Sequence, residues 1–337
     1  MPCLKIKDIE LDSSVMLAPM AGYTDTVFRC LVRSFGGVGL AFSEMVNPRS
    51  ALYGGGNKRD AILACFPEDT PLSWQIYGGP SEPLAEAAQW LVERGATMLD
   101  INMGCPKRKI TGRAAGAGIL KDPDSAVKLV ESVVRSVSVP VTVKIRSGWK
   151  ETILDKNDFI PRIEMAGAAA ITVHPRSAMQ GYSGSADWRQ IKLVVDQVKI
   201  PVIGSGDITS PEDGVRMMNE TGCAGFMIGR AALKLPWLLR DTYRMIAGLP
   251  SLPTPSIPEI FELMKVHFEA TVKFHGDEMG AVLFRKWIPF YAKSLMLNKE
   301  TMVSLIRTQR TDDLRFRFSN LTIVPEKAED GAEGNGC

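Results

Sequence analysis

The stretch Val15-Met-Leu-Ala-Pro-Met-Ala-Gly22 is a short apolar run that ends in a turn. A run that is apolar on both faces is typical of a parallel strand buried under helices. An open doubly wound sheet usually places G-x-G-x-x-G after its first strand. The turn Ala18-Pro-Met-Ala-Gly22 lacks that pattern. The first strand therefore favours a closed barrel over an open sheet.

Seven similar segments follow, and amphipathic stretches with helix signals separate them. The predicted strands are Val15–Ala21, Gly39–Met45, Leu72–Tyr77, Met98–Asn102, Val141–Ile145, Ala170–His174, Val202–Gly204 and Gly225–Ile228. Strand–helix repeats of this number and spacing predict an α/β fold, a (β/α)8 TIM barrel.

The sequence changes character after the predicted barrel. We expect a barrel over residues 1–247 and, because Pro and Ser are frequent there, a linker over 248–258. Apolar residues recur with helical spacing across 259–325, which predicts a small helical domain. Residues 326–337 are acidic and rich in Gly, which predicts a disordered tail.

Composition limits the classes of protein to consider. The 337 residues are 45% hydrophobic and 23% charged, as in ordinary globular proteins, and the net charge of +2 does not by itself indicate a nucleic-acid partner. The N-terminus resembles no secretion signal, and no apolar run approaches the length of about 20 residues that spans a bilayer. We expect a cytoplasmic, monomeric protein without a membrane segment.

Cys105 stands apart from the other cysteines. The six cysteines are scattered without a C-x-x-C pair, and there are only three histidines, so we expect no metal site. Cys105 lies in a turn between Gly104 and Pro106, and four positive charges follow it within 107–113. Such charges can hold a polyanion beside the thiol.

The ends of the last two predicted strands indicate a phosphate site. TIM barrels often bind phosphate between the loops after strands seven and eight. Gly206 and Gly229 would let backbone N–H groups approach a phosphate, and Arg230 would neutralise it. The alternative is that both loops are plain turns.

Polar residues in apolar strands indicate a ligand at the barrel mouth. Lys144 and Gln75 each interrupt an apolar run, and His174 ends another. A charged side chain at such a place needs a partner, and an amide both donates and accepts. Together they predict hydrogen-bonding groups around a flat polar heterocycle, although each alone is equally compatible with a structural role.

Longer motifs carry a family resemblance, in order along nearly the whole predicted barrel. They are APMAGYTD (18–25), SEM (43–45), DINMGCPKRKI (100–110), GAGIL (116–120), VKIRSGW (143–149), ITVHPRSAMQGYSGSADW (171–188), PVIGSGDI (201–208) and MIGRAA (227–232). The chain resembles the tRNA-dihydrouridine synthases, and most of all their bacterial B-type subfamily. The resemblance implies an FMN-containing TIM barrel with a C-terminal helical domain.

The resemblance also implies roles for individual residues. FMN would be held by Pro19, Met20, Ala21, Gln75, Lys144, His174, Ser205, Gly206, Asp207, Gly229 and Arg230. Asn102 would contact the flipped-out uracil, Arg176 and Lys109 the RNA, and Cys105 would donate a proton. The family usually has Asn where Ser205 stands, so at this position we expect a backbone contact to the flavin. NADPH, or NADH, would supply the electrons.

The predicted helical domain is locally basic. Residues 281–320 hold eight Lys or Arg against three acids, mixed with aromatic residues. Such a surface can bind phosphates and stack bases, and Arg285 and Lys286 are the candidate tRNA contacts. The alternative is a solvated helix face with an aromatic core behind it.

The function that the resemblance implies is reduction of the C5=C6 bond of specific uridines in the tRNA D-loop. Because the thiol of a free cysteine is mostly protonated at neutral pH, a residue such as Cys105 suits the role of acid. One alternative is an FMN-dependent reductase of free pyrimidines, similar to dihydroorotate dehydrogenase, but it gives no reason for a basic C-terminal region. A non-catalytic tRNA-binding module gives no reason for Cys105 and Lys144.

Overall fold

The structure is a computed structural model that describes residues 4–55 and 57–322. The chain divides into two compact units, and the boundary between them falls at Ser251-Leu252. Residues 249–256 around this boundary have no helix or strand. The tail predicted over 326–337 lies outside the described residues.

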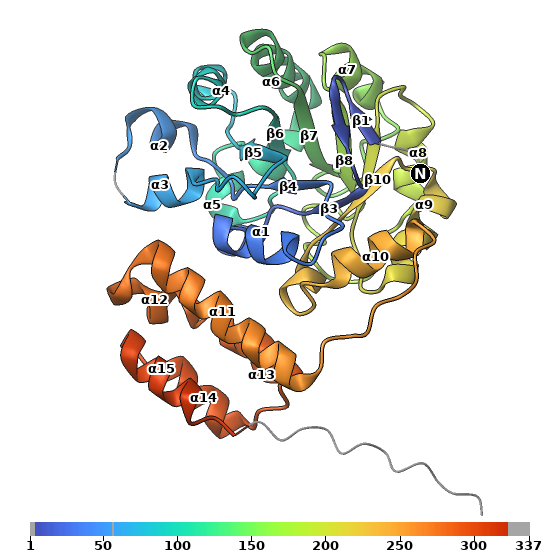
Figure 1. Ribbon diagram of the computed structural model, residues 1–337. Coiled ribbons are helices and arrows are strands. Elements are labelled where there is room, and N and C mark those ends of the chain that lie inside the picture. The colour runs from blue at the N-terminus through green and yellow to red at the C-terminus, as the bar shows by residue number, and fades with distance from the viewer. Residues whose placement is uncertain (1–3, 56, 323–337) are drawn as a thin grey trace, which may run out of the picture. The chain divides into compact units, whose positions relative to one another are not determined.

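Eight parallel strands close into a barrel in the order β10-β3-β4-β5-β6-β7-β8-β9, which confirms the predicted fold (Figure 1). Their bounds are β3 Val15–Leu17, β4 Leu40–Phe42, β5 Leu72–Ile76, β6 Leu99–Met103, β7 Val141–Arg146, β8 Ala170–His174, β9 Val202–Ser205 and β10 Gly225–Ile228. The first strand ends earlier than predicted. Pro19 has no N–H for the ladder, and the Met20 N–H donates to Thr24 Oγ1 at 3.0 Å.

Helices surround the barrel (Figure 1). They are α1 Thr26–Arg33, α2 Pro48–Tyr53, α3 Asn57–Leu63, α4 Leu84–Val92, α5 Arg108–Thr111, α6 Pro123–Ser136, α7 Phe159–Met165, α8 Arg189–Val195, α9 Pro211–Thr221 and α10 Leu238–Ile246, with 3-10 turns η1 Gly116–Lys121 and η2 Arg230–Leu233. Their ends follow local rules. Ser210 and Asp213 form a capping box that begins α9, and Gly222 ends it with φ of 70°.

An N-terminal hairpin, which the sequence analysis did not predict, covers one end of the barrel. Its antiparallel strands are β1 (Leu4–Ile6) and β2 (Ile9–Leu11). Leu4, Ile6 and Leu11 are buried in one cluster with residues at the starts of barrel strands, among them Met98 and Ala169. The hairpin thus closes the amino-terminal end of the barrel and leaves the carboxyl ends of its strands for a site.

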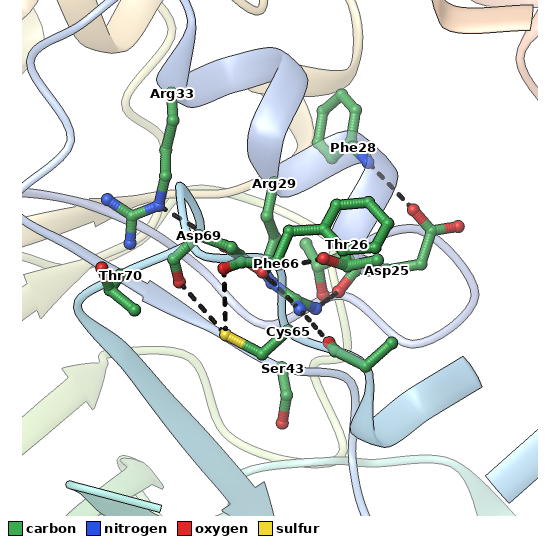
Figure 2. A network of polar contacts seen from close by, with 12 residues as sticks. Asp25, Thr26, Phe28, Arg29, Arg33, Ser43, Cys65, Phe66, Asp69 and Thr70 are labelled. Carbon is green, nitrogen blue, oxygen red and sulfur yellow. Dashed lines mark hydrogen bonds and ion pairs between the residues drawn. The ribbon is translucent and has the colours of Figure 1, made fainter. Parts of the chain in front are cut away.

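A buried ion pair anchors α1 to the loop before β5 (Figure 2). Arg29 Nη2 lies 2.6 Å from Asp69 Oδ2, and both side chains are fully buried. Arg33 Nε contacts the other oxygen of Asp69 at 3.4 Å, and Thr26 donates to Asp69 at 3.2 Å. Arg29 also donates to the carbonyl of Thr24 at 2.5 Å. The network therefore supports the turn between β3 and α1.

The second unit is helical and has an aromatic core. Its helices are α11 Ile257–His275, α12 Asp277–Phe284, α13 Ile288–Ser294, α14 Lys299–Arg307 and α15 Thr311–Ser319. Buried His267 lies 4.6 Å from Trp287 and 5.3 Å from Phe284, measured between ring centroids. Edge-on packing of this kind is the favoured geometry for aromatic rings. Across the described part of the chain, no helix combines the length and the apolar character that a membrane span requires.

Candidate active site

Four of the predicted site residues, on β5, β6, β7 and β9, meet toward the carboxyl end of the barrel. Asn102 on β6 lies opposite Lys144 on β7, and its Nδ2 donates to Oε1 of Gln75 on β5 at 2.8 Å. Lys144 Nζ lies 3.4 Å from Oγ of Ser205 on β9. The barrel thus gathers residues from distant parts of the sequence into one polar ring.

The Cys105 turn is attached to this ring. Asn102 Oδ1 accepts hydrogen bonds from the backbone N–H groups of Gly104, at 3.1 Å, and Cys105, at 2.9 Å. On the other side, the Ala117 N–H donates to the Cys105 carbonyl at 3.0 Å. Gly116 has φ of +54°, and a Cβ there would come within 2.8 Å of that carbonyl. The half-buried Cys105 is therefore held by its own backbone and its immediate neighbours.

Asp100 is a buried member of the ring that the sequence analysis did not single out. Its Oδ2 accepts from Gln75 Nε2, and its Oδ1 accepts from Thr142 Oγ1, both at 2.6 Å. Its side chain is fully buried. The signal was present, because Asp100 is a charged residue in an apolar strand, as is Lys144.

Burial and charge oppose each other at Asp100 and Lys144. Burial raises the pKa of Asp100, while the hydrogen bonds from Thr142 and Gln75 and the charge of Lys144 act to lower it. Burial lowers the pKa of Lys144, and the negative charge of Asp100 acts to raise it. Each group therefore favours the charged form of the other.

His174 is a neutral imidazole in this environment. Burial lowers its pKa far below the ordinary value, and the positive charges of Lys144, Arg146, Arg176 and Arg230 add to the effect. Its buried Nδ1 has no hydrogen-bond partner within the described residues. A Cβ on Gly206, where φ is +118°, would lie 3.3 Å from His174 Nε2 and 3.1 Å from Ala186 Cβ. Glycine at 206 thus keeps space beside the imidazole.

Arg176 and Asp207 bind each other. Arg176 is almost fully buried and donates to Asp207 Oδ2 at 2.7 Å and to the carbonyl of Gly184 at 2.5 Å. Asp207 also accepts from the Ala186 N–H at 2.7 Å. Burial acts to raise the pKa of Asp207, but these hydrogen bonds outweigh it and hold the pKa below its usual value. The pair fixes the loop after β8, while Nη1 of Arg176 has no partner in the part of the chain described.

The ends of β3 and β10 form the remaining side of the site. A Cβ on Gly229 would lie 3.7 Å from Ala18 Cβ and 3.9 Å from Met20 Sδ, which places Gly229 beside the first turn. Pro19 is half-buried, and Ala21 is exposed. Arg230 is exposed, and its guanidinium lies 4.5 Å from the ring of Tyr182.

A model of the dihydrouridine synthase family matches residues 16–314. The chain belongs to this family. It is 39% identical over 291 residues to a probable tRNA-dihydrouridine synthase of Rhodobacter capsulatus, covering 86% of this chain and 90% of the relative. It is 38% identical over 314 residues to tRNA-dihydrouridine synthase B of Pseudomonas aeruginosa, covering 93% of each.

Solved structures show the same fold at low identity. Morphinone reductase aligns with a TM-score of 0.52 and 14% identity over 74% of this chain and 90% of its own. Histamine dehydrogenase from Rhizobium sp. 4-9 aligns with a TM-score of 0.55 and 12% identity over 80% of this chain and 50% of its own. What these two proteins share with this chain is the barrel fold.

Three predicted contacts of this dihydrouridine synthase family member lie outside the ring. Lys109 is exposed on the short helix α5. Arg285 and Lys286 belong to the second unit, where Arg285 Nε lies 3.4 Å from the Val282 carbonyl and Lys286 Nζ lies 5.4 Å from the Trp287 ring. Within the described residues of the first unit, no hydrogen bond joins Lys109 to the ring residues.

Proposed function

We propose that this protein reduces uridine to dihydrouridine in the D-loop of tRNA, with FMN as cofactor and NADPH, or NADH, as electron donor. The observation that carries the proposal is the ring of Gln75, Asn102 and Lys144 around the Cys105 turn, at the carboxyl end of the barrel. Membership of the dihydrouridine synthase family and the names of two relatives support the choice of substrate.

The residues present fit both the heterocycle and the phosphate of FMN. The buried Nδ1 of His174 lacks a partner among the described residues, and no Cβ fills the space at Gly206 and Gly229. Gln75, Lys144 and His174 would hold the heterocycle. Backbone groups at Gly206 and Gly229, with Arg230, would hold the phosphate. When bound, FMN supplies the hydride that adds to C6 of uracil.

Cys105 supplies the proton in this proposal. A hydride added to C6 leaves an electron pair at C5, conjugated with the C4 carbonyl, and the thiol proton forms the new C5–H bond. The thiolate then recovers a proton from solvent. Lys144 would stabilise negative charge on the flavin ring. The Ser205 hydroxyl lies beside Lys144 Nζ and would help to orient the ammonium group.

The second unit offers a surface for tRNA. Helices α14 and α15 line a cavity of about 1020 Å³, whose charged lining residues are Lys299, Arg307 and Arg317 against Glu300 and Asp313. Phe316 in the same lining is 70% exposed, which suits stacking of an unpaired base. Arg315 is less available, because it forms ion pairs with Glu269, Asp277 and Asp312.

The test maps dihydrouridine in tRNA from cells that carry or lack this gene, together with the absorption spectrum of the purified protein. We expect loss of dihydrouridine at defined D-loop positions and a flavin spectrum. A colourless protein that binds tRNA would favour a non-catalytic module. Reduction of free pyrimidines, with tRNA unmodified, would favour the dihydroorotate dehydrogenase-like alternative.

A further inference from the structure

We propose that Asp100 is a positioning residue that fixes the orientation of two amides, those of Gln75 and Asn102, and through them the Cys105 turn. The inference rests on the proposed function for its catalytic meaning. The hydrogen bonds that link Asp100 to the Cys105 turn do not depend on that function, because they join only residues of this protein. Asp100 is fully buried and is separated from the Cys105 turn by these two side chains.

The hydrogen bonds form a chain with one direction. An ionised carboxylate only accepts, so Asp100 draws the NH2 group of Gln75 toward itself, at 2.6 Å. The carbonyl oxygen of Gln75 then faces Asn102 and accepts from its Nδ2 at 2.8 Å. The carbonyl oxygen of Asn102 is left to face the turn.

The end of the hydrogen-bond series at the Cys105 turn requires the same direction. Backbone N–H groups only donate, and those of Gly104 and Cys105 both point at Asn102 Oδ1. A rotated Asn102 amide would place its NH2 group against these two donors and leave them unsatisfied. Asp100 and the turn therefore select one arrangement from opposite ends, and a change at Asp100 reaches the Cys105 backbone.

These hydrogen bonds also decide which donor or acceptor of the Asn102 amide is left for a ligand. Its oxygen already accepts two hydrogen bonds, and one of its two N–H bonds is used by Gln75. One N–H donor remains. Asn102 can therefore contact a carbonyl oxygen of a pyrimidine or flavin ring, and it cannot accept a hydrogen bond from a ring N–H.

An exchange of donor and acceptor along the chain tests the inference. Gln75→Glu places a second carboxylate against Asp100. Adding Asp100→Asn restores the pattern, because the new amide donates to the new carboxylate, which still accepts from Asn102. Thr142→Val is the matched control, since it removes the other hydrogen bond to Asp100 and leaves the Gln75 contact in place. Asp100→Leu removes the acceptor altogether.

The readout is hydrogen exchange of the Gly104 and Cys105 amides, measured by mass spectrometry on the full-length protein as purified. Peptides covering 225–230 report any general loosening or loss of flavin. We expect Gln75→Glu and Asp100→Leu to accelerate exchange at 104–105 by about fivefold or more, the effect of a lost hydrogen bond. The double variant should return to within about twofold of wild type, as should Thr142→Val.

Two results would overturn the inference. One is a double variant that exchanges as fast as Gln75→Glu alone. The other is exchange at the wild-type rate at residues 104–105 in Asp100→Leu. If Asp100→Leu does not fold, the comparison of Gln75→Glu with the Gln75→Glu, Asp100→Asn double variant still decides. Failure of the proposed function is distinguishable, because it would appear as wild-type protein that forms no dihydrouridine while the exchange pattern holds.

Discussion

Arg176 and Asp207 form an ion pair of 2.7 Å between the segments that follow β8 and β9. Arg176 is 2% exposed and Asp207 is 32% exposed, so the pair lies at the edge of the interior. The resemblance assigned Arg176 to RNA and Asp207 to the cofactor. Both residues also hold the loop after β8, because Arg176 donates to the Gly184 carbonyl and Asp207 accepts from the Ala186 N–H.

Asp207→Asn should therefore lower stability, by about 1–3 kcal/mol, because Arg176 keeps its charge without a full counter-ion while Asp207 is partly solvated. The pKa of Asp207 is depressed in the folded state, so its contribution is present above the unfolded-state pKa. It is lost as the pH falls through the folded-state pKa. Urea unfolding at pH 7 and at about pH 3 should show a smaller difference between variant and wild type at the lower pH. An equal difference at both values would contradict this account.

Asp69→Ala should be more costly. Arg29 and Asp69 are both fully buried, and removal of one partner leaves an unpaired buried charge, which typically costs about 3–5 kcal/mol. The matched control is Glu10→Ala, which removes the exposed Lys5–Glu10 pair and should change stability by less than about 1 kcal/mol. Thermal unfolding of both variants measures the contrast. An equal loss of stability in the two variants would show that the buried Arg29–Asp69 pair contributes no more than the exposed Lys5–Glu10 pair.

Arg230→Ala should release flavin if the phosphate lies between the loops after β9 and β10. The lost charge-assisted contact is of order 1.5–3 kcal/mol, about tenfold to a hundredfold in affinity. The flavin content after dialysis measures it. Retention at the wild-type level would place the phosphate elsewhere.

Cys105→Ala should separate the two half-reactions. The variant should fold, bind flavin and be reduced by NADPH at nearly the wild-type rate, because the thiol has no part in those steps. Oxidation of the reduced protein by tRNA should slow by about 10²–10⁴-fold, the usual contribution of a positioned acid. Cys105→Ser should rescue poorly, since a hydroxyl is a much weaker acid.

Rapid mixing of reduced protein with tRNA measures this step directly. If the thiol only packs in its turn, Cys105→Ala will alter stability slightly and leave the step intact. A rate within about threefold of wild type would remove Cys105 from the mechanism. Lys109 or a water molecule would then be the candidate acid.

Arg307→Glu with Arg317→Glu should weaken tRNA binding and flatten its dependence on salt, because phosphate contacts release counter-ions. Flavin reduction by NADPH should not change. Lys7→Glu with Lys199→Glu, at two exposed lysines of the first unit, reverses the same charge and serves as the control. Arg315→Glu should weaken tRNA binding less than Arg307→Glu or Arg317→Glu alone, because Arg315 already has three acidic partners. Unchanged affinity in the double variant would move the tRNA surface away from this cavity.

The sequence alone determined the barrel and most of its strand positions. Ala170–His174 and Gly225–Ile228 were predicted with the bounds that the structure has, because apolar runs between helix signals are local patterns. The hairpin β1–β2 was missed. Its strands have three residues each, too few for a periodic signal, and their burial depends on the barrel end that they cover.

The candidate site divides in the same way. Gln75, Lys144 and His174 were identifiable because each is a polar residue within or at the end of an apolar strand. Asp100 carried the same signal, but its importance depends on which side chains β5 and β7 bring to it. Which group accepts from the Asn102 amide, and whether Arg176 is bound to Asp207, follow from contacts between residues 27 and 31 positions apart. Local sequence sets a residue's chemistry and the type of element that carries it, while closure of the barrel sets its partners, because only closure brings distant strand ends within hydrogen-bonding distance.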